Sequence, residues 1–310
     1  MSRFERWAWA FVAYLLFVIL FGAWVRITGS GAGCGTHWPL CQGAMVPDAP
    51  GTHTLIEYTH RLTSGLSGLF GLGLVWWSRR IGAPVFRAAV AMLVFLIVEG
   101  LIGAVLVKKE LVAGDASTSR AIVVALHLTN TLLLMACAAA IAWRAGPGAW
   151  DRRESAPRGW LAALVLLVVA TNATGAITAL GDTLFPLQPA LDGGLFAKVR
   201  DDLSPAHHFL VRLRILHPVV AMISVVAGGG ILLWLMERSS LRLLKSALHA
   251  LAGQTALGLL NIALGAPGWM QLVHLLAAQV VWILVVLAAM SLWGRSGDGG
   301  VGRALEATAV

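Results

Sequence analysis

The sequence predicts an all-α integral membrane protein with eight transmembrane helices, arranged as two tandem four-helix bundles related by a pseudo-twofold axis along the membrane normal. Three observations predict this fold class: the composition, the number of long apolar windows and a repeat between the halves of the chain. Of the 310 residues, 58% are hydrophobic and 12% are charged, and the mean hydropathy is +0.79. A soluble domain of this size could not bury so much apolar surface, so we expect a membrane protein.

Eight windows are long enough for helices that cross a bilayer, which needs about 20 apolar residues. They are rich in Leu, Val, Ala and Gly and lack the alternating pattern of barrel strands, which favours helices. The first window has too long an apolar run for a signal peptide and no small-residue cleavage site after it, so we expect it to be retained. In chain order, the expected helices cover residues 8–27, 56–77, 86–107, 121–143, 159–180, 207–235, 244–264 and 270–293.

The basic residues predict the orientation, because Lys and Arg concentrate on the cytoplasmic side of membrane proteins. We expect a multi-pass protein of the cell membrane with both termini in the cytoplasm, a cytoplasmic linker at 146–158 and a cytoplasmic tail at 295–310. The net charge of +8 contains no run of five like charges, so no nucleic-acid partner is expected. This orientation places 14 of the 23 basic residues inside, namely Arg3, Arg6, Arg79, Arg80, Arg87, Arg144, Arg152, Arg153, Arg158, Arg238, Arg242, Lys245, Arg295 and Arg303.

The two expected bundles, residues 1–145 and 159–294, have similar sequences. The segment "FGAWVRITGSG" at the end of the first window matches "TGAITALGD" at the end of the fifth, and "EGLIGA" in the third is similar to "QTALG" in the seventh. His60 and His217 lie early in the second window of each half, and His127 and His274 lie early in the fourth. Because each half holds an even number of windows, the two copies would face the same way.

Four histidines therefore fall at duplicated positions in the outer part of the expected membrane region. Ionisable residues inside membrane helices are costly and commonly mark function. Two imidazoles from facing helices can ligate a haem iron from both sides, and a helical bundle can hold the porphyrin. Zinc is the competing metal, but no histidine cluster has the spacing of a zinc site. Each histidine alone could instead be a packing residue that forms a hydrogen bond.

Glu57 lies three residues before His60, on the same face of the expected helix. If His60 ligates haem, the Glu57 carboxylate could accept a proton at the porphyrin edge. Alternatively, Thr54 and Glu57 could form a capping box at the start of the helix. The equivalent place before His217 holds Arg214, so only the N-terminal half has this acid.

Three arginines border the histidines of the second and sixth windows. Arg61, Arg212 and Arg214 could bind haem propionates, because a guanidinium matches the geometry of a carboxylate. They could equally be ordinary arginines of the membrane interface.

Two of the three cysteines lie in "GAGCGTHWPLCQG", between the first two windows. The charge rule places this loop outside the cytoplasm, where a disulfide between Cys34 and Cys41 is permitted. Such a bridge would stabilise the protein by about 2 to 3 kcal/mol through chain entropy, or it would act in redox chemistry. The residues alone leave both roles open.

Together these motifs resemble the haem A synthase family. The resemblance extends over nearly the whole chain and rests on "VRITGSGAGCGTHWPLCQG", "EYTHRLTSG", "ALHLTNTLLL", "LRILHPVVA" and "LVHLLAAQ". It implies an oxidoreductase that converts the C8 methyl of haem O to a formyl group by two successive hydroxylations. It also implies residue roles: substrate-haem ligands His60 and His127, haem b ligands His217 and His274, a catalytic Glu57, and a functionally important disulfide between Cys34 and Cys41.

The same resemblance implies a haem b cofactor, haem O as substrate, and contacts with haem O synthase, an electron acceptor and membrane lipid. Some members have a second cysteine pair in the loop after the fifth helix, but residues 181–206 contain no cysteine. The alternative function is a diheme b-type electron-transfer protein linked to quinol. The electron acceptor, the source of the inserted oxygen, the formation of a homo-oligomer and the role of Glu99 remain open at this stage.

Overall fold

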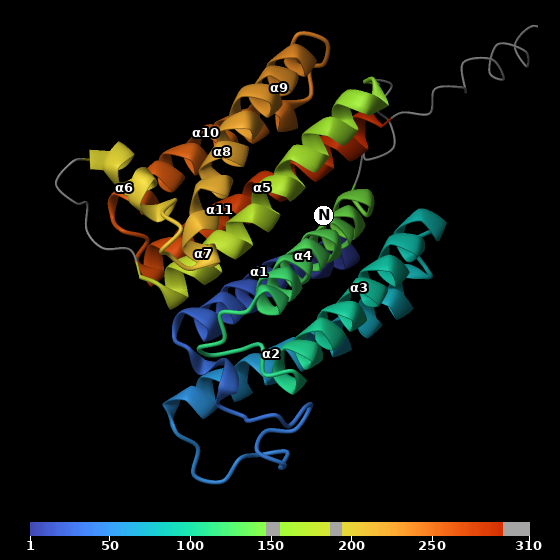
Figure 1. The fold of residues 1–310 in the computed structure, drawn as a ribbon. Coiled ribbons are helices and arrows are strands. Elements are labelled where there is room, and N and C mark those ends of the chain that lie inside the picture. Colours follow the sequence, from blue (N-terminus) through green and yellow to red (C-terminus); the bar gives the residue numbers. More distant parts are fainter. Residues whose placement is uncertain (147–155, 187–193, 294–310) are drawn as a thin grey trace, which may run out of the picture.

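The computed structural model describes residues 1–146, 156–186 and 194–293, and these residues form helices joined by loops (Figure 1). The expected cytoplasmic tail and most of the expected linker lie outside the described residues. The long helices are α1 (Arg3–Ile27), α2 (Thr52–Ser78), α3 (Ala83–Lys108), α4 (Thr118–Arg144), α5 (Arg158–Leu184), α10 (Arg242–Ala263) and α11 (Gly268–Leu292), and the shorter ones include η1 (Ser30–Ala32) and α6 (Gly194–Asp202). No β-strand occurs in the described part of the chain, as the sequence predicts.

The sixth expected helix is compound. It consists of α7 (Phe209–Arg212), the 3₁₀ segment η2 (Leu213–Ile215), α8 (Leu216–Ile223), the π segment η3 (Ser224–Gly228) and α9 (Gly229–Met236). The expected span at 207–235 is confirmed as the helical stretch Phe209–Met236, which changes between α, 3₁₀ and π turns along its length. Pro218 lacks an N–H to donate to the preceding turn, and the 3₁₀ segment lies in that turn.

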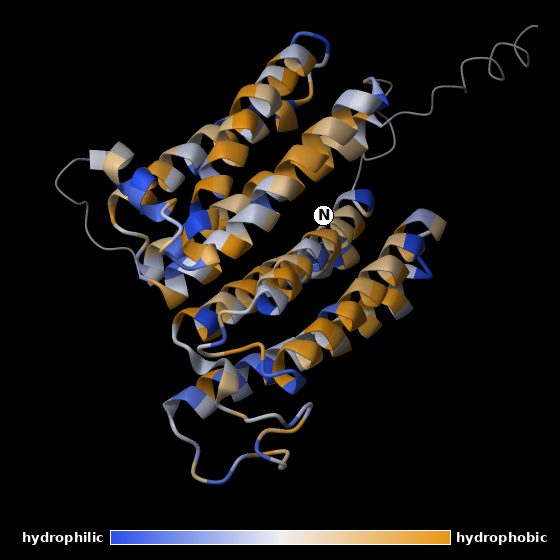
Figure 2. Ribbon diagram, viewed as in Figure 1, coloured by the Kyte–Doolittle hydropathy of each residue, from blue (hydrophilic) through white to orange (hydrophobic). Residues whose placement is uncertain are grey.

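Six helices in the described residues are long and apolar enough to cross a membrane: α1, α3, α4, α5, the stretch Phe209–Met236, and α11. Hydrophobic residues follow the lengths of the helices, and hydrophilic residues gather at their ends and in the loops (Figure 2). The structure and the composition together indicate a multi-pass membrane protein. Helices α2 and α10 are long but more polar, and they do not meet the same criterion of length and hydropathy.

The two halves of the chain lie side by side, with α1–α4 in one group and α5–α11 in the other (Figure 1). Helices α1 and α4 pack against α5 and α11 at the boundary. At its centre the buried Trp282 of α11 donates an indole hydrogen bond to the carbonyl oxygen of Leu132 on α4, at 2.7 Å. This satisfied polar group lies in a core of aliphatic side chains that joins the halves.

Candidate functional site

A cavity of about 940 Å³ is lined by residues from both halves and by all four repeated histidines. Its wall is mostly apolar, with a few charged and polar side chains. Pockets for small molecules and cofactors typically measure about 300–1,000 Å³. The cavity therefore has room for a large ligand, and it is continuous between the halves.

His217 and His274 face each other across the part of the cavity in the C-terminal half. Their ring centres are 6.3 Å apart, and the ring planes are nearly perpendicular at 81°. A bond between a metal ion and an imidazole nitrogen is about 2 Å long, so two imidazoles on opposite sides of one metal ion have ring centres about 6 Å apart. The observed separation fits this arrangement.

The other contacts of these two rings also suit metal ligands. His217 Nδ1 lies 3.1 Å from the carbonyl oxygen of Thr171, the kind of partner that orients a ligating histidine. His274 Nε2 lies 3.2 Å from the side-chain nitrogen of Gln254. His274 Nδ1 is buried and has no hydrogen-bond partner among the described residues.

In the N-terminal half, His60 and His127 line the same cavity. The His60 ring packs edge-on against Phe21, with ring centres 5.7 Å apart, and its buried Nδ1 has no hydrogen-bond partner in the described part of the chain. His127 Nδ1 lies 3.3 Å from a carboxylate oxygen of Glu99. Nδ1 is within ion-pair distance of this carboxylate but forms no hydrogen bond in the described part of the chain.

Glu99, whose role the sequence left open, joins α3 to α4 beside His127. Its carboxylate accepts a hydrogen bond from the Asn130 amide at 2.5 Å and another from the Thr131 hydroxyl. The sequence signal was present, because Glu99 and Gln254 belong to the matched segments of the two halves. Only the structure shows that each contacts the repeated histidine of the next helix.

Three of the four histidine rings lie against a glycine on a neighbouring helix. A Cβ atom added to Gly22 would lie 3.0 Å from His60, and one added to Gly175 or Gly258 would lie 3.1 Å from His217 or His274. These glycines leave the space that the imidazole rings occupy. No glycine among the described residues lies against His127 in this way, and a Cβ added to Gly103 would meet no atom within 4 Å.

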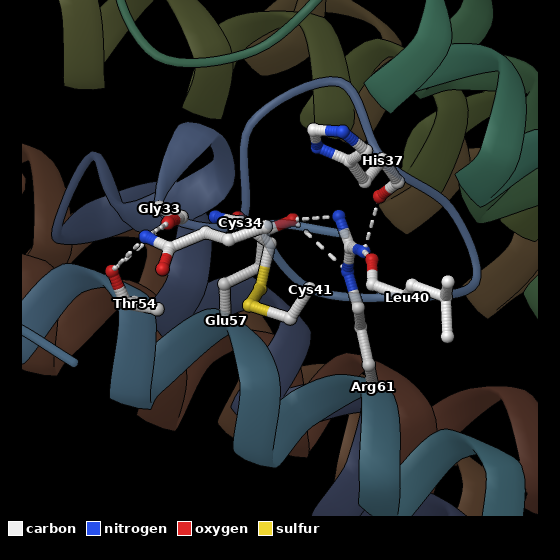
Figure 3. The surroundings of a disulfide bond; sticks show 9 residues. Gly33, Cys34, His37, Leu40, Cys41, Thr54, Glu57 and Arg61 are labelled. Atoms are coloured by element: carbon white, nitrogen blue, oxygen red, sulfur yellow. Dashed lines mark hydrogen bonds and ion pairs between the residues drawn. A yellow bond between two sulfur atoms is a disulfide. The ribbon is translucent and has the colours of Figure 1, made fainter. Parts of the chain in front are cut away.

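The Glu57 side chain is buried beneath the disulfide loop, with its residue only 3% exposed (Figure 3). Its Oε2 accepts the backbone N–H of Cys34 at 2.8 Å, and its Oε1 accepts two N–H groups of Arg61 at 2.5 and 3.2 Å. The capping-box alternative is wrong, because α2 begins at Thr52 with Gly51 as its N-cap. Thr54 instead donates to the carbonyl oxygen of Gly33.

The loop between α1 and α2 contains the predicted disulfide, and both Cys34 and Cys41 are buried. Arg61 ties this loop to α2, because its Nη1 donates to the carbonyl oxygens of His37 at 2.6 Å and Leu40 at 2.5 Å (Figure 3). Gly33 packs so closely on the start of α2 that an added Cβ would lie 2.5 Å from the His53 carbonyl oxygen. The disulfide loop, Arg61 and Glu57 therefore form one connected unit.

The C-terminal half has a different ion pair near its histidines. Arg214 Nε lies 2.8 Å from Asp182, and the Arg214 Nη2 group donates to the carbonyl oxygens of Gly181 and Phe185. These contacts hold α5 against η2. Arg212 is exposed on α7 and does not line the cavity.

These residues fit haem. The separation of His217 and His274, the buried ring nitrogens without partners and the apolar wall all suit a flat, iron-containing ligand. No three His, Cys, Asp or Glu side chains in the described residues gather as they would around a zinc ion. A haem iron needs only two axial ligands from the protein.

The fold and this site define a class of protein: a helical membrane protein with paired histidines around an apolar cavity. The family model of COX15-CtaA, described as cytochrome oxidase assembly protein, matches residues 5–286. The chain therefore belongs to this family, the haem A synthase family, as the sequence motifs predict.

The individual relatives that match the chain have two different names. A protoheme IX farnesyltransferase of Thermus thermophilus is 42% identical over 314 residues, covering 96% of this chain and 51% of that protein. A heme A synthase of Geobacillus kaustophilus is 46% identical over 108 residues, which is 34% of each chain. A heme A synthase of Bacillus licheniformis is 42% identical over 125 residues, covering 39% of this chain and 38% of that protein. The chain thus spans about half the length of the first of these relatives.

Proposed function

We propose that this protein is a haem A synthase, a membrane oxidoreductase that converts the C8 methyl group of haem O to a formyl group. The conversion is a four-electron oxidation: each of two hydroxylations replaces a C–H hydrogen by a hydroxyl group from water, releases two protons and passes two electrons to an external electron acceptor. The first gives a hydroxymethyl group, and the second gives a geminal diol that loses water to form the formyl group. The observation that supports it best is the single cavity lined by four histidines in two pairs and by the carboxylate of Glu57. The heme A synthases among the relatives support the same reaction.

The two pairs of histidines take different roles in this proposal. His60 and His127 hold the substrate, haem O, and His217 and His274 hold the cofactor, haem b. When bound, haem b supplies one-electron transfer. The assignment follows the family resemblance and agrees with the position of Glu57, which is one helical turn from His60.

Glu57 is the proposed proton acceptor. Its carboxylate lines the cavity, and the Cys34 N–H and Arg61 fix the direction of both oxygens. A positioned general base contributes about 10²–10⁴-fold to a rate. Because Arg61 also binds the loop carbonyls, the disulfide loop would hold this carboxylate in place during turnover.

We further propose that α2 and α10 also cross the membrane, which gives eight spans, two tandem four-helix bundles and both termini in the cytoplasm. The placement of basic residues and the repeated glycine–histidine contacts support this arrangement. Reporter fusions after residue 145 and inside the disulfide loop test it. We expect a cytoplasmic signal from the first fusion and an external signal from the second, and the reverse would overturn the topology.

The proposed substrate would come from a haem O synthase that contacts this protein. The Thermus thermophilus relative named as a protoheme IX farnesyltransferase supports a link between the two proteins, because this chain matches about half of it. Co-purification of the two proteins from membranes tests the contact. Recovery of neither with the other would contradict it.

The reaction is tested by expressing the protein in cells that make haem O and extracting the pigments. We expect haem A and its hydroxymethyl precursor, with the empty vector as the control. Persistent absence of both pigments from cells that contain the folded protein would overturn the proposed function. The diheme electron-transfer alternative predicts that absence.

A further inference from the structure

Two arginines line the cavity without an ion pair within 4 Å among the described residues: Arg26 on α1 and Arg120 on α4. The arginines that the sequence singled out are engaged elsewhere or lie apart. Arg61 uses four of its five N–H groups on Glu57 and the loop carbonyls, and Arg214 binds Asp182. The cavity wall therefore has two guanidinium groups that are not in direct contact with a carboxylate of the described residues.

Arg120 is 5% exposed, and its guanidinium is only partly satisfied. Nη1 donates to the carbonyl oxygens of Ala113 at 2.7 Å and Asp115 at 2.6 Å. The buried Nε has no hydrogen-bond partner within the described ranges. The Asp115 carboxylate lies close enough to attract this guanidinium but forms no ion pair with it. A charged donor left unsatisfied in an apolar environment is unfavourable, so Nε is available for a further acceptor.

Arg26 lies at the boundary between the halves. Its Nη1 donates to the carbonyl oxygen of Ala179 at 2.6 Å and to the Thr183 hydroxyl, and its Nη2 donates to Gln271 at 3.0 Å. All three partners are uncharged. Arg26 lies close enough to interact electrostatically with Asp182, which is ion-paired to Arg214, and with Arg120. Its guanidinium therefore has a carboxylate in range but none in direct contact.

Both arginines lie beside the His60–His127 pair. Arg120 precedes His127 by seven residues, or two turns of α4, so the two residues share a face and are about 10 Å apart along the helix. Arg26 follows Gly22 by four residues, and Gly22 is the residue packed against the His60 ring. Arg26 lies in the last turn of α1 and Arg120 in the first turn of α4, so both residues are nearer the loop end of the bundle than Gly22 and His127 are. The Arg26 guanidinium reaches from there toward α5 and α11.

We propose that Arg26 and Arg120 form a carboxylate subsite that binds the propionate groups of the haem held between His60 and His127. The inference rests on the proposed function, because it needs a haem at this pair. Haem carries its two carboxylates on one edge, and a guanidinium binds a carboxylate through paired, charge-assisted hydrogen bonds. The subsite fixes which edge of the porphyrin points toward the disulfide-loop end of the bundle.

The test compares two probes: iron protoporphyrin IX and its dimethyl ester, which lacks both charges. The full chain is purified from cells that make no haem O, and each probe is titrated into it while the optical spectrum is followed. We expect the wild type to bind the diacid at least about tenfold more tightly than the diester. Arg120→Gln should weaken the diacid by about the same factor and leave the Kd of the diester within about twofold.

Further variants separate binding from folding. Arg26→Gln also removes contacts between the halves, so Arg120→Lys gives the second measurement. It keeps the charge but loses the paired N–H groups of the guanidinium, and we expect an intermediate preference for the diacid over the diester. Arg212→Gln changes an exposed arginine outside the cavity and should keep the full preference for the diacid over the diester. Equal weakening of both probes in Arg120→Gln, or an unchanged preference, would overturn the subsite. Failure of the wild type to bind either probe would instead overturn the proposed function.

Discussion

The two halves of the molecule place the same side chains around the cavity. Gly22 lies against His60 as Gly175 lies against His217, and the fourth long helix of each half adds a second histidine to the cavity wall. These shared contacts follow the repeated segments of the sequence. Each half therefore has two histidines on the cavity wall, which is the number of side chains that a haem iron needs.

The neighbours of these histidines differ in charge. The N-terminal half has carboxylates, Glu57 before His60 and Glu99 beside His127. At the matched positions the C-terminal half has Arg214, neutralised by Asp182, and the uncharged Gln254. The difference supports the proposal that the two halves have different roles, because the carboxylates beside the N-terminal histidines can accept protons. This is the reason for placing the proposed reaction in the N-terminal half.

The largest effect is expected from removing the acid that only the N-terminal half has. Glu57→Gln keeps the size of the side chain and an acceptor for the Cys34 N–H but loses the base. Formation of haem A should fall by about 10²–10⁴-fold while the haem b spectrum persists, as measured by pigment extraction and optical spectroscopy. Glu237→Gln, on an exposed side chain, is the control. Undiminished product formation in Glu57→Gln would favour the electron-transfer alternative.

A smaller effect is expected from exchanging the partners of the fourth-helix histidines. Glu99→Gln removes the carboxylate that orients His127 and should weaken haem binding at the N-terminal pair by about 10–100-fold in optical titrations. Gln254→Glu is the matched change in the other half. It should lower the reduction potential of haem b, because a carboxylate partner makes a histidine a stronger donor to iron. Unchanged haem affinity in Glu99→Gln and an unchanged reduction potential in Gln254→Glu would mean that these two side chains do not distinguish the halves.

The disulfide loop is present only before α2, and its removal should have a moderate effect. Cys34→Ser should lower stability by about 2–3 kcal/mol, seen as a lower thermal midpoint in detergent. Product formation per folded protein should also fall, since the Cys34 N–H holds Glu57. Cys137→Ser, on the free cysteine of α4, is the control. Normal product formation in Cys34→Ser would limit the bridge to a stabilising role.

The smallest effect is expected at the glycines that the halves share. Gly175→Ala places a Cβ 3.1 Å from the His217 ring, so the ring must shift by a few tenths of an ångström. Haem b affinity should fall a few-fold, with a small shift of its absorption bands, because ligand geometry changes without loss of the ligand. In Gly159→Ala, on the same helix, the added Cβ meets no atom within 4 Å. This variant should change neither the haem b affinity nor the absorption bands. Equal behaviour of the two variants would mean that Gly175 does not position the ring.

Much of this arrangement could be predicted from the sequence because periodic apolar windows and repeated histidines are local signals. The helices and the family followed from them, and the disulfide followed from two cysteines in one short outer loop. The partners of the charged side chains could not be predicted from the sequence, because these contacts depend on which loop folds back onto which helix. Glu57 reaches the disulfide loop, Arg61 binds the loop carbonyls, and Glu99 contacts His127 from another helix. The π segment Ser224–Gly228 likewise gave no periodic signal.

The central claim is that each half binds one haem through its own pair of histidines, and that the N-terminal haem is the substrate. The most direct measurement is the pigment content of the purified His60→Ala and His274→Ala variants, expressed where haem O is made. We predict that His60→Ala retains haem b and contains neither haem O nor haem A, while His274→Ala loses haem b. Loss of every pigment from both variants, or the same pigments in both, would contradict the account.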